Sequence, residues 1–259
     1  MDIKLFLDQQ VRQFNQESFL KEDPIQIPKK FKKREDIEIA GFLTSIITWG
    51  NRKAIIKSAS LLMDLMENEP YRFIVEGSES EWEKMNNFVY RTFNSSDLLF
   101  LMKALKNVLK SYGNLENIFN NYFQQSDNIK DSIIGFRSEL LNTTHLRRSE
   151  KHLANPAKGS AAKRINMFLR WMVRKDNSGI DFGIWDSIPM SALMIPLDVH
   201  SGRMARNLGL LSRKQNDWKA VEELTERLRE LDSDDPIKYD FALFGMGVNK
   251  VNPVVEGTK

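Results

Sequence analysis

The 259-residue sequence contains no cysteine, which excludes disulfides, thiolate zinc sites and cysteine-ligated iron–sulfur clusters. Its three histidines, His145, His152 and His200, lack the spacing of a zinc site. No P-loop or dinucleotide fingerprint occurs. The Asp-Phe-Gly tripeptide at 181–183 lacks the Gly-rich and catalytic loops that accompany it in kinases. We therefore expect neither a metal nor a cofactor.

Long apolar runs are also missing, since none approaches the roughly 18 residues that span a bilayer. The N-terminal segment MDIKLFLDQQVRQF has no cleavable signal pattern, so we expect a cytoplasmic protein without a membrane partner. A large excess of positive or negative charge is missing as well. A net charge of +3 is only mildly basic, and by itself it argues weakly for a nucleic-acid partner.

Apolar residues instead recur at helical spacing along most of the chain. This periodicity predicts helices, among others, over 3–19, 36–49, 97–112 and 217–231. No run of alternating strands and no internal repeat is visible. With 41% hydrophobic and 28% charged residues, the chain has a globular composition and can bury a large core in one domain or two lobes. We expect an all-α fold.

The stretch 155–208 contains the residues with the clearest chemical potential. A turn at Lys158-Gly159-Ser160 leads into an amphipathic helix with Lys163 in its first turn, and its arginines, including Arg170 and Arg174, are expected to be solvated. Further on, Pro196-Leu197 stops the chain and Asp198 takes the N-cap position of a second helix. A lysine and an aspartate thus each open a helix.

These segments resemble a known superfamily. GSAAKRINMFL is similar to the segment carrying the Schiff-base lysine of the helix-hairpin-helix-GPD DNA glycosylases, and PLDVHSGRMARNLGL is similar to the segment carrying their aspartate. GFLTSIITWGNRKAIIKSASLLMDL resembles their early helix-loop-helix. Over nearly its whole length the chain also resembles an uncharacterised bacterial family with FVYR, YGNLE, FLRWMVRKD and KYDFALFG-type segments.

The resemblance implies a two-lobed helical fold with a cleft between the lobes. Within one unit of 1–259, a helical lobe spans about 30–140, and a hairpin-like lobe spans 145–210 with 1–30 and 211–259 packed on it. The chain departs from the superfamily at the Gly-x-Gly hairpin, where it has only Pro156 to Ser160. The spacing from lysine to aspartate is wide and similar to that of archaeal 8-oxoguanine glycosylases, because an insert occupies 176–191.

The resemblance also assigns roles to individual residues. Lys163 takes the place of the nucleophile and Asp198 that of the catalytic aspartate. Predicted DNA contacts are Trp49, Asn51, Arg52, Lys158, Gly159, Ser160, Arg164, His200 and Arg203. The predicted base pocket contains Tyr239, Phe241 and Phe244, although core packing fits at least two of these rings better.

Each assignment has a purely structural alternative. Trp49 or Asn51 fills the gap left by an extruded base, or else Trp49 packs in the core and the turn caps a helix. Lys163 is a nucleophile or a solvated lysine, and His200 contacts a phosphate or a backbone group. Asp198 can cap its helix and act in catalysis at once. Between 147 and 175, nine basic residues face one acidic residue, which indicates a phosphate-binding face or a solvated surface.

The leading hypothesis is a DNA glycosylase with lyase activity on a damaged base in duplex DNA, for example an oxidised purine. Such an enzyme needs an uncharged lysine to attack the sugar, and we expect burial, the helix N-terminus and Arg164 to favour that state. Asp198 would then stabilise the charge that develops on the sugar. The alternative hypotheses are a non-catalytic DNA- or RNA-binding protein on the same scaffold and a helical interaction protein.

Overall fold

The computed structural model describes residues 2–251, without the side chains of residues 19 and 20, and these residues are mostly helical. The chain divides into two compact units, one formed by 22–155 and the other by 1–21 together with 156–259. The all-α expectation is therefore confirmed. The small departure from it is a two-stranded antiparallel ladder that pairs Val89 with Asn94 and Tyr90 with Phe93.

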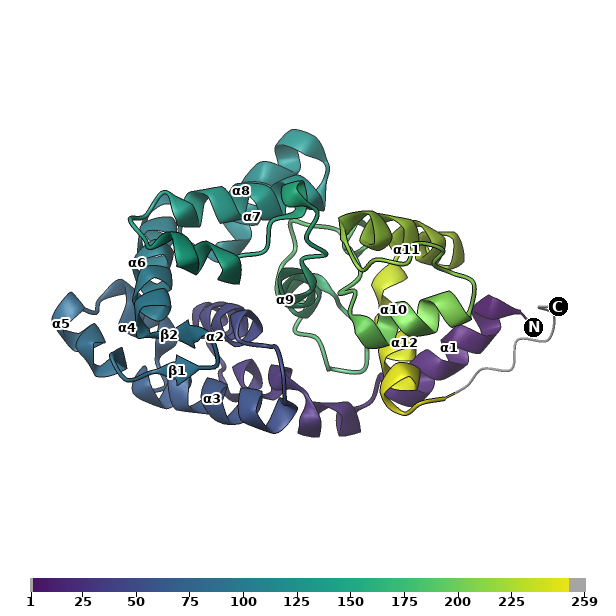
Figure 1. Cartoon of the computed structure of the whole chain (residues 1–259), viewed down its shortest axis with the longest axis horizontal. Coiled ribbons are helices and arrows are strands. Elements are labelled where there is room, and N and C mark those ends of the chain that lie inside the picture. The colour runs from purple at the N-terminus through teal and green to yellow at the C-terminus, as the bar shows by residue number, and fades with distance from the viewer. Residues whose placement is uncertain (1, 252–259) are drawn as a thin grey trace. The chain divides into compact units, whose positions relative to one another are not determined.

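The first unit, 22–155, is built from helices that surround the helix α2. Its elements are α2 (Arg34–Ile46), α3 (Arg52–Leu65), α4 (Pro70–Val75), α5 (Glu79–Trp82), β1 (Val89–Tyr90), β2 (Phe93–Asn94), α6 (Ser95–Tyr112), α7 (Leu115–Ser126) and α8 (Ile129–Leu141). Helices α7 and α8 lie side by side (Figure 1). Phe136 on α8 is close to both Phe119 and Phe42, with ring centroids 4.5 and 5.2 Å apart.

Helix α2 is buried on nearly every face, as its apolar sequence predicts. Its buried acid, Glu38, accepts hydrogen bonds from the amide of Leu115 at 3.0 Å and from Arg34 at 3.1 Å. Since Leu115 is the first residue of α7, the carboxylate satisfies one of the free amides at that helix's start. A charged residue in this apolar helix thus stabilises the start of α7, which the Asn114 side chain also caps.

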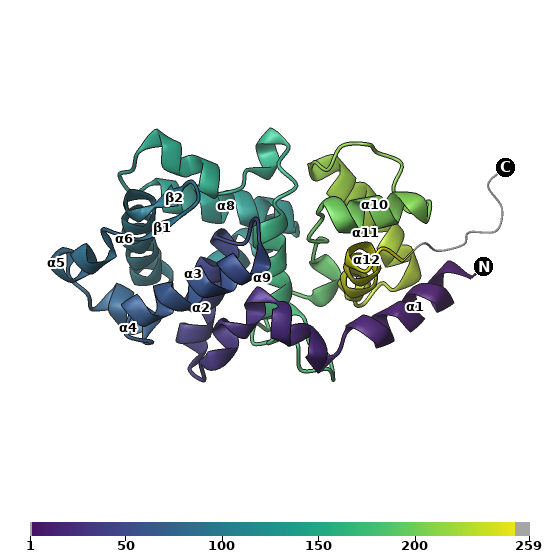
Figure 2. The same ribbon diagram turned by 60° about the horizontal axis from the view of Figure 1, so that its bottom comes forward.

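The second unit contains the segments with the predicted chemistry. Its helices are α1 (Ile3–Phe14), α9 (Lys163–Val173), α10 (Val199–Asn207), α11 (Trp218–Leu231) and α12 (Tyr239–Val248). Helix α12 lies beside α10 and α1 (Figures 1 and 2). Two glycines permit this packing, because a Cβ on Gly247 would lie 2.8 Å from the carbonyl oxygen of His200, and one on Gly245 would overlap the Phe14 ring.

The arginines of α9 correct the expectation that they are solvated. Arg170 and Arg174 are 3% and 2% exposed, and both are neutralised by buried aspartates. Arg174 pairs with Asp181 at 3.0 Å and with Asp235 at 2.9 Å. It also pairs with Asp176 at 2.6 Å. The insert 176–191 therefore supplies acidic partners that allow charged residues on the core side of α9, consistent with the rule that buried charges are paired.

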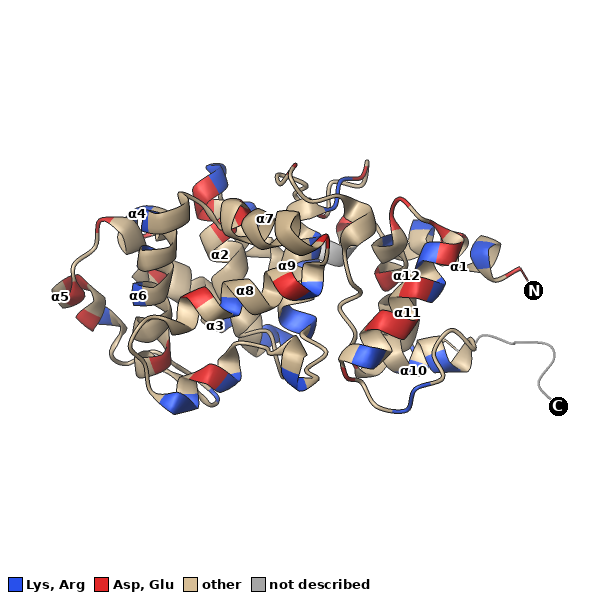
Figure 3. Cartoon of the chain, turned by 90° about the horizontal axis from the view of Figure 1, so that it is seen from above, with Lys and Arg blue, Asp and Glu red and all other residues tan. Residues whose placement is uncertain are grey.

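Surface charges of both signs are mixed in the described residues. Figure 3 shows basic and acidic segments following one another along α11. The run from Arg147 to Lys175 is divided between the two units. At least five of its nine basic residues are paired with acids: Arg148 with Asp97, Lys163 with Asp198, Arg170 with Asp181 and Asp240, Arg174 with the aspartates above, and Lys175 with Asp186. Within 2–251, no helix is both long and apolar enough to cross a bilayer.

Candidate active site

The structure brings the two predicted catalytic side chains together. Lys163 is the first residue of α9, and Asp198 is the N-cap of α10, as the sequence predicts. The Nζ of Lys163 donates to Oδ2 of Asp198 at 2.9 Å. The lysine side chain is 32% exposed and the aspartate side chain 10%. Two residues 35 positions apart in sequence therefore form one solvent-accessible ion pair between two helix N-termini.

The two oxygens of Asp198 have different tasks. Oδ1 accepts from the amides of His200 at 2.8 Å and Ser201 at 2.9 Å, while Oδ2 remains for Lys163. Burial tends to raise the pKa of Asp198, but the Lys163 ammonium and these hydrogen bonds outweigh it and lower the pKa below its ordinary value. The side-chain amide of Asn216 also donates to the Asp198 carbonyl at 2.9 Å. The aspartate is thus held in place and ionised at neutral pH.

The ion pair bears directly on the expected uncharged amine. A carboxylate within hydrogen-bonding distance stabilises an ammonium, so the contact with Asp198 works against an uncharged amine. The same helix start disfavours a cation, because the free amides there carry partial positive charge. A lysine amine has to lose this proton before it can act as a nucleophile.

Phe244 is the predicted pocket ring that lies near the ion pair. Its ring centroid is 5.7 Å from the Lys163 Nζ, and the His200 ring meets it edge-on at 6.0 Å. Tyr239 and Phe241 are 0% and 1% exposed, so neither ring presents a face to a ligand in this structure. Phe241 instead packs against the Arg170 guanidinium, 4.4 Å from its centroid.

Sequence reasoning missed a second acidic group near the pair, Asp240 on α12. Arg170 Nη1 donates to its Oδ2 at 2.5 Å, and Ser201 Oγ donates to its Oδ1 at 3.4 Å. Burial raises the pKa of Asp240 to about 6, with the charge of Asp198 acting in the same direction and Arg170 and Lys163 acting against it. A single aspartate in the apolar stretch KYDFALF is the sequence signal that identifies it.

The turn before α9 has Lys158, Gly159 and Ser160 exposed. The Gly159 amide is bonded to the Pro156 carbonyl at 2.9 Å, and its own carbonyl accepts from the Trp218 amide at 3.0 Å. Gly159 adopts φ +86°, a conformation that favours glycine. The turn is therefore fixed to the start of α11, and its position next to Lys163 suits the predicted phosphate contact.

The remaining DNA contacts predicted for this unit have structural partners of their own. Arg203 donates to the Gly247 carbonyl at 2.7 Å and so links α10 to the end of α12. Arg164 is partly buried, and that burial lowers its pKa to about 10, which leaves the guanidinium charged at neutral pH. Arg203 and His200 remain exposed on the helix that Asp198 caps.

The predicted wedge turn belongs to the other unit, 22–155. Trp49 is half-buried, and its ring stacks on His152 and meets Tyr90 edge-on, with centroids 5.8 and 5.2 Å apart. Asn51 accepts from the Ala54 amide at 3.2 Å and is the N-cap of α3 rather than the C-cap of α2. Arg52 lies 3.8 Å from Glu22. Trp49 is thus supported by neighbours but is not fully buried.

His152 rests in turn on a buried acid. Its Nε2 lies 3.3 Å from Oδ2 of Asp97, which is 0% exposed. Ser149 Oγ donates to Asp97 at 2.6 Å and Arg148 at 2.8 Å. Burial tends to raise the pKa of Asp97, yet the Ser149 hydrogen bond and the neighbouring cations lower it overall. This cluster supports the His152 ring on which Trp49 stacks.

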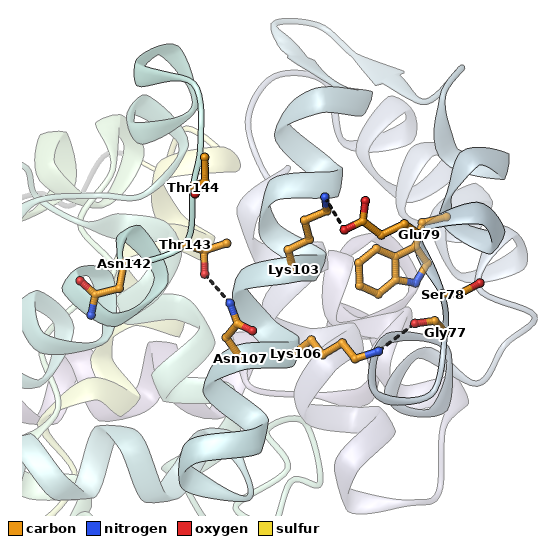
Figure 4. Close-up of a pocket in the computed structure, with 10 residues that line it drawn as sticks. Gly77, Ser78, Glu79, Lys103, Lys106, Asn107, Asn142, Thr143 and Thr144 are labelled. Carbon is orange, nitrogen blue, oxygen red and sulfur yellow. Dashed lines mark hydrogen bonds and ion pairs between the residues drawn. The ribbon is translucent and has the colours of Figure 1, made fainter.

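A pocket of about 610 Å³ also lies in the unit 22–155, and it is lined by Gly77, Ser78, Glu79, Trp82, Lys103, Lys106, Asn107, Asn142, Thr143 and Thr144. None of these is a predicted site residue. Its lysines are already engaged, Lys103 with Glu79 at 2.8 Å and Lys106 with the Gly77 carbonyl at 2.9 Å (Figure 4). The pocket is therefore a weaker functional candidate than the partly exposed lysine–aspartate pair.

Comparison with known proteins places the chain in a family. Neither the curated proteins nor the solved structures include a match. The sequence model of one family, described as a protein of unknown function (DUF2400), matches residues 23–249. This match agrees with the resemblance to an uncharacterised family. Because it covers most of the sequence, both the wedge turn and the lysine–aspartate pair included, the chain belongs to the DUF2400 family.

Proposed function

We propose that this protein is a DNA glycosylase with an associated lyase activity, acting on a damaged base in duplex DNA. The observation that carries the proposal is the 2.9 Å contact between Lys163 and Asp198, each at the start of its own helix. An amine and a carboxylate in contact, partly open to solvent, match what attack on a sugar C1′ requires.

The proposed reaction begins with cleavage of the bond between the base and C1′. The bond's electron pair leaves with the base, which takes up the proton released by Lys163. Negative charge on Asp198 stabilises the positive charge that develops on the sugar. The Lys163 nitrogen then bonds to C1′, the bond from C1′ to the ring oxygen breaks as one proton passes from the nitrogen to that oxygen, and a protonated imine results. In the lyase step water takes up a C2′ proton, a double bond forms between C2′ and C3′, and the phosphate leaves C3′ with the electron pair of the broken C3′–O bond.

Other groups of the same unit fit binding of the extruded nucleotide. The Phe244 ring lies next to the amine and nearly perpendicular to the His200 ring, and it is a candidate for contact with the extruded base. Exposed Lys158 lies in the turn that leads into α9 and suits a backbone phosphate. In the unit 22–155, half-buried Trp49 is a candidate for the ring that fills the gap in the duplex.

Borohydride trapping tests the proposal. The protein is incubated with duplexes that each contain one lesion, beginning with an oxidised purine and an abasic site, and the imine is reduced to a stable adduct. We expect an adduct with the wild type and none with Lys163→Arg, which keeps the cation next to Asp198 but cannot form the imine. Lys175→Gln is the matched control, because this exposed lysine lies just beyond the other end of α9.

The ion pair itself favours a second candidate, a non-catalytic nucleic-acid-binding protein on this scaffold. A lysine that stays charged binds phosphate and does not attack a sugar. This candidate predicts salt-dependent DNA or RNA binding, no trapping with any lesion, and equal binding by the wild type and Lys163→Arg. An adduct that requires Lys163 would exclude it.

A further inference from the structure

Asp240 is buried beside the proposed nucleophile but is not part of the proposed chemistry. It is 6% exposed and lies on α12, while its neighbours come from two other helices. Helix α9 contributes Arg170, whose Nη1 lies 2.5 Å from Oδ2. Helix α10 contributes Ser201, whose Oγ lies 3.4 Å from Oδ1. The Asp240 carboxyl group on α12 therefore contacts side chains of both α9 and α10.

Ser201 connects Asp240 to the ion pair, because its Oγ donates to Asp240 Oδ1 at 3.4 Å and its amide donates to Asp198 Oδ1 at 2.9 Å. Lys163 and Arg170 are on α9, two turns apart, and Ser201 is on the helix that Asp198 caps. The charges of both Lys163 and Asp198 act on the Asp240 carboxyl. Arg170 is shared, because its Nε also donates to Asp181 at 3.2 Å. The charged groups around Asp240 are thus two cations and two carboxylates.

These surroundings make the charge of Asp240 consequential for the amine. When Asp240 is ionised, it adds a negative charge in a low-dielectric region near Lys163 and so stabilises the ammonium. It also repels the Asp198 carboxylate. When Asp240 is neutral, the ammonium loses that support while the Asp198 contact remains. The charge of Asp240 thereby influences the protonation of Lys163.

We propose that Asp240 is a positioning residue that controls when Lys163 loses its proton. The proposal rests on the proposed function, in which Lys163 must become uncharged to attack the sugar. Asp240 does not touch the sugar or the base in this account. It acts through Lys163 by electrostatics, and Arg170 and Ser201 hold it in place.

A pKa of about 6 supports this role, because the group then changes its charge within about one pH unit of neutrality. Burial is the main cause of that value. Folding therefore already favours the neutral carboxyl relative to water, and asparagine is its close neutral counterpart. An Asp240→Asn variant keeps an acceptor for Arg170 and removes the titrating charge.

The test is the pH profile of trapping on abasic-site DNA by wild type and Asp240→Asn. The variant is expected to reach half-maximal trapping at a lower pH, by on the order of one unit, which is about tenfold in rate on the acidic limb. Ser201→Ala should shift the profile in the same direction by less, since the lost hydrogen bond favours the neutral form of Asp240.

Asp235→Asn is the matched control. Asp235 also pairs with an arginine at the end of α9, Arg174, at 2.9 Å, and burial also raises its pKa. It is not among the strongest influences on the pKa of Asp240. Its profile should coincide with that of the wild type. A profile for Asp240→Asn that is unshifted, or shifted no more than that of Asp235→Asn, would overturn the role of Asp240.

A second readout separates this inference from the glycosylase proposal. The amine of Lys163 is titrated without DNA, by competitive labelling with acetic anhydride at a series of pH values and mass spectrometry of the labelled peptide. A shift to lower pH in Asp240→Asn and Ser201→Ala supports the electrostatic control even if the wild type traps no DNA. Coincident labelling curves overturn it even if trapping succeeds.

Discussion

Substitutions of Asp198 separate its structural task from its chemical one. Oδ1 caps α10 by accepting from two backbone amides, and Oδ2 pairs with Lys163. Asp198→Asn keeps an oxygen for the cap and loses the ion pair, whereas Asp198→Ala loses both. An N-cap contributes about 1 kcal/mol, and a partly exposed ion pair contributes up to about 1 kcal/mol.

We therefore expect Asp198→Asn to lower the free energy of unfolding by up to about 1 kcal/mol and Asp198→Ala by about 2 kcal/mol. Both should lose base excision almost completely, because neither has a carboxylate to stabilise charge on the sugar. The assays are urea unfolding followed by circular dichroism and single-turnover excision. Equal stability of the two variants would refute the cap, and wild-type excision by Asp198→Asn would refute the chemical role.

Three further perturbations follow from the packing and charges. Folding favours the neutral form of Asp240, so the contribution of this residue to the free energy of unfolding falls as pH rises from about 4 to 6. Over that window the free energy of unfolding of Asp240→Asn should rise by up to about 3 kcal/mol relative to that of the wild type. Asp97 has the opposite effect, because its pKa is lowered in the folded protein. It stabilises the fold at neutral pH, and this stabilisation is lost as pH falls below about 4. On acidification Asp97→Asn should therefore lose less free energy of unfolding than the wild type. Gly247→Ala would place a Cβ 2.8 Å from the His200 carbonyl oxygen, and thermal unfolding should show a loss of about 1–3 kcal/mol despite the better helix propensity of alanine.

Local sequence rules were enough to place Lys163 and Asp198 at helix starts. An aspartate after Pro-Leu and before an apolar periodic segment is a cap signal that depends on near neighbours alone. For α6 the same rules offer Asn94 to Ser96 as N-caps and favour Ser95 or Ser96. The structure uses Asn94, which forms a reciprocal capping box with Asp97.

Long-range pairing was beyond those rules. Arg170 and Arg174 have the spacing of a solvated stripe, and their burial depends on Asp181, Asp235 and Asp240 arriving from elsewhere in the chain. A sequence pattern does not report such partners. For the same reason Asp240 was overlooked, although an isolated acid in an apolar helix signals a buried partner and can be searched for directly.

The most direct test of the central claim is to identify the residue that carries the trapped sugar. Wild-type protein is reduced with borohydride on abasic-site DNA, digested with nuclease and protease, and analysed by tandem mass spectrometry. The account predicts the reduced sugar on the Nζ of Lys163. An adduct on another lysine or on the N-terminal amine, or no adduct while Lys163 is intact and accessible, would contradict it.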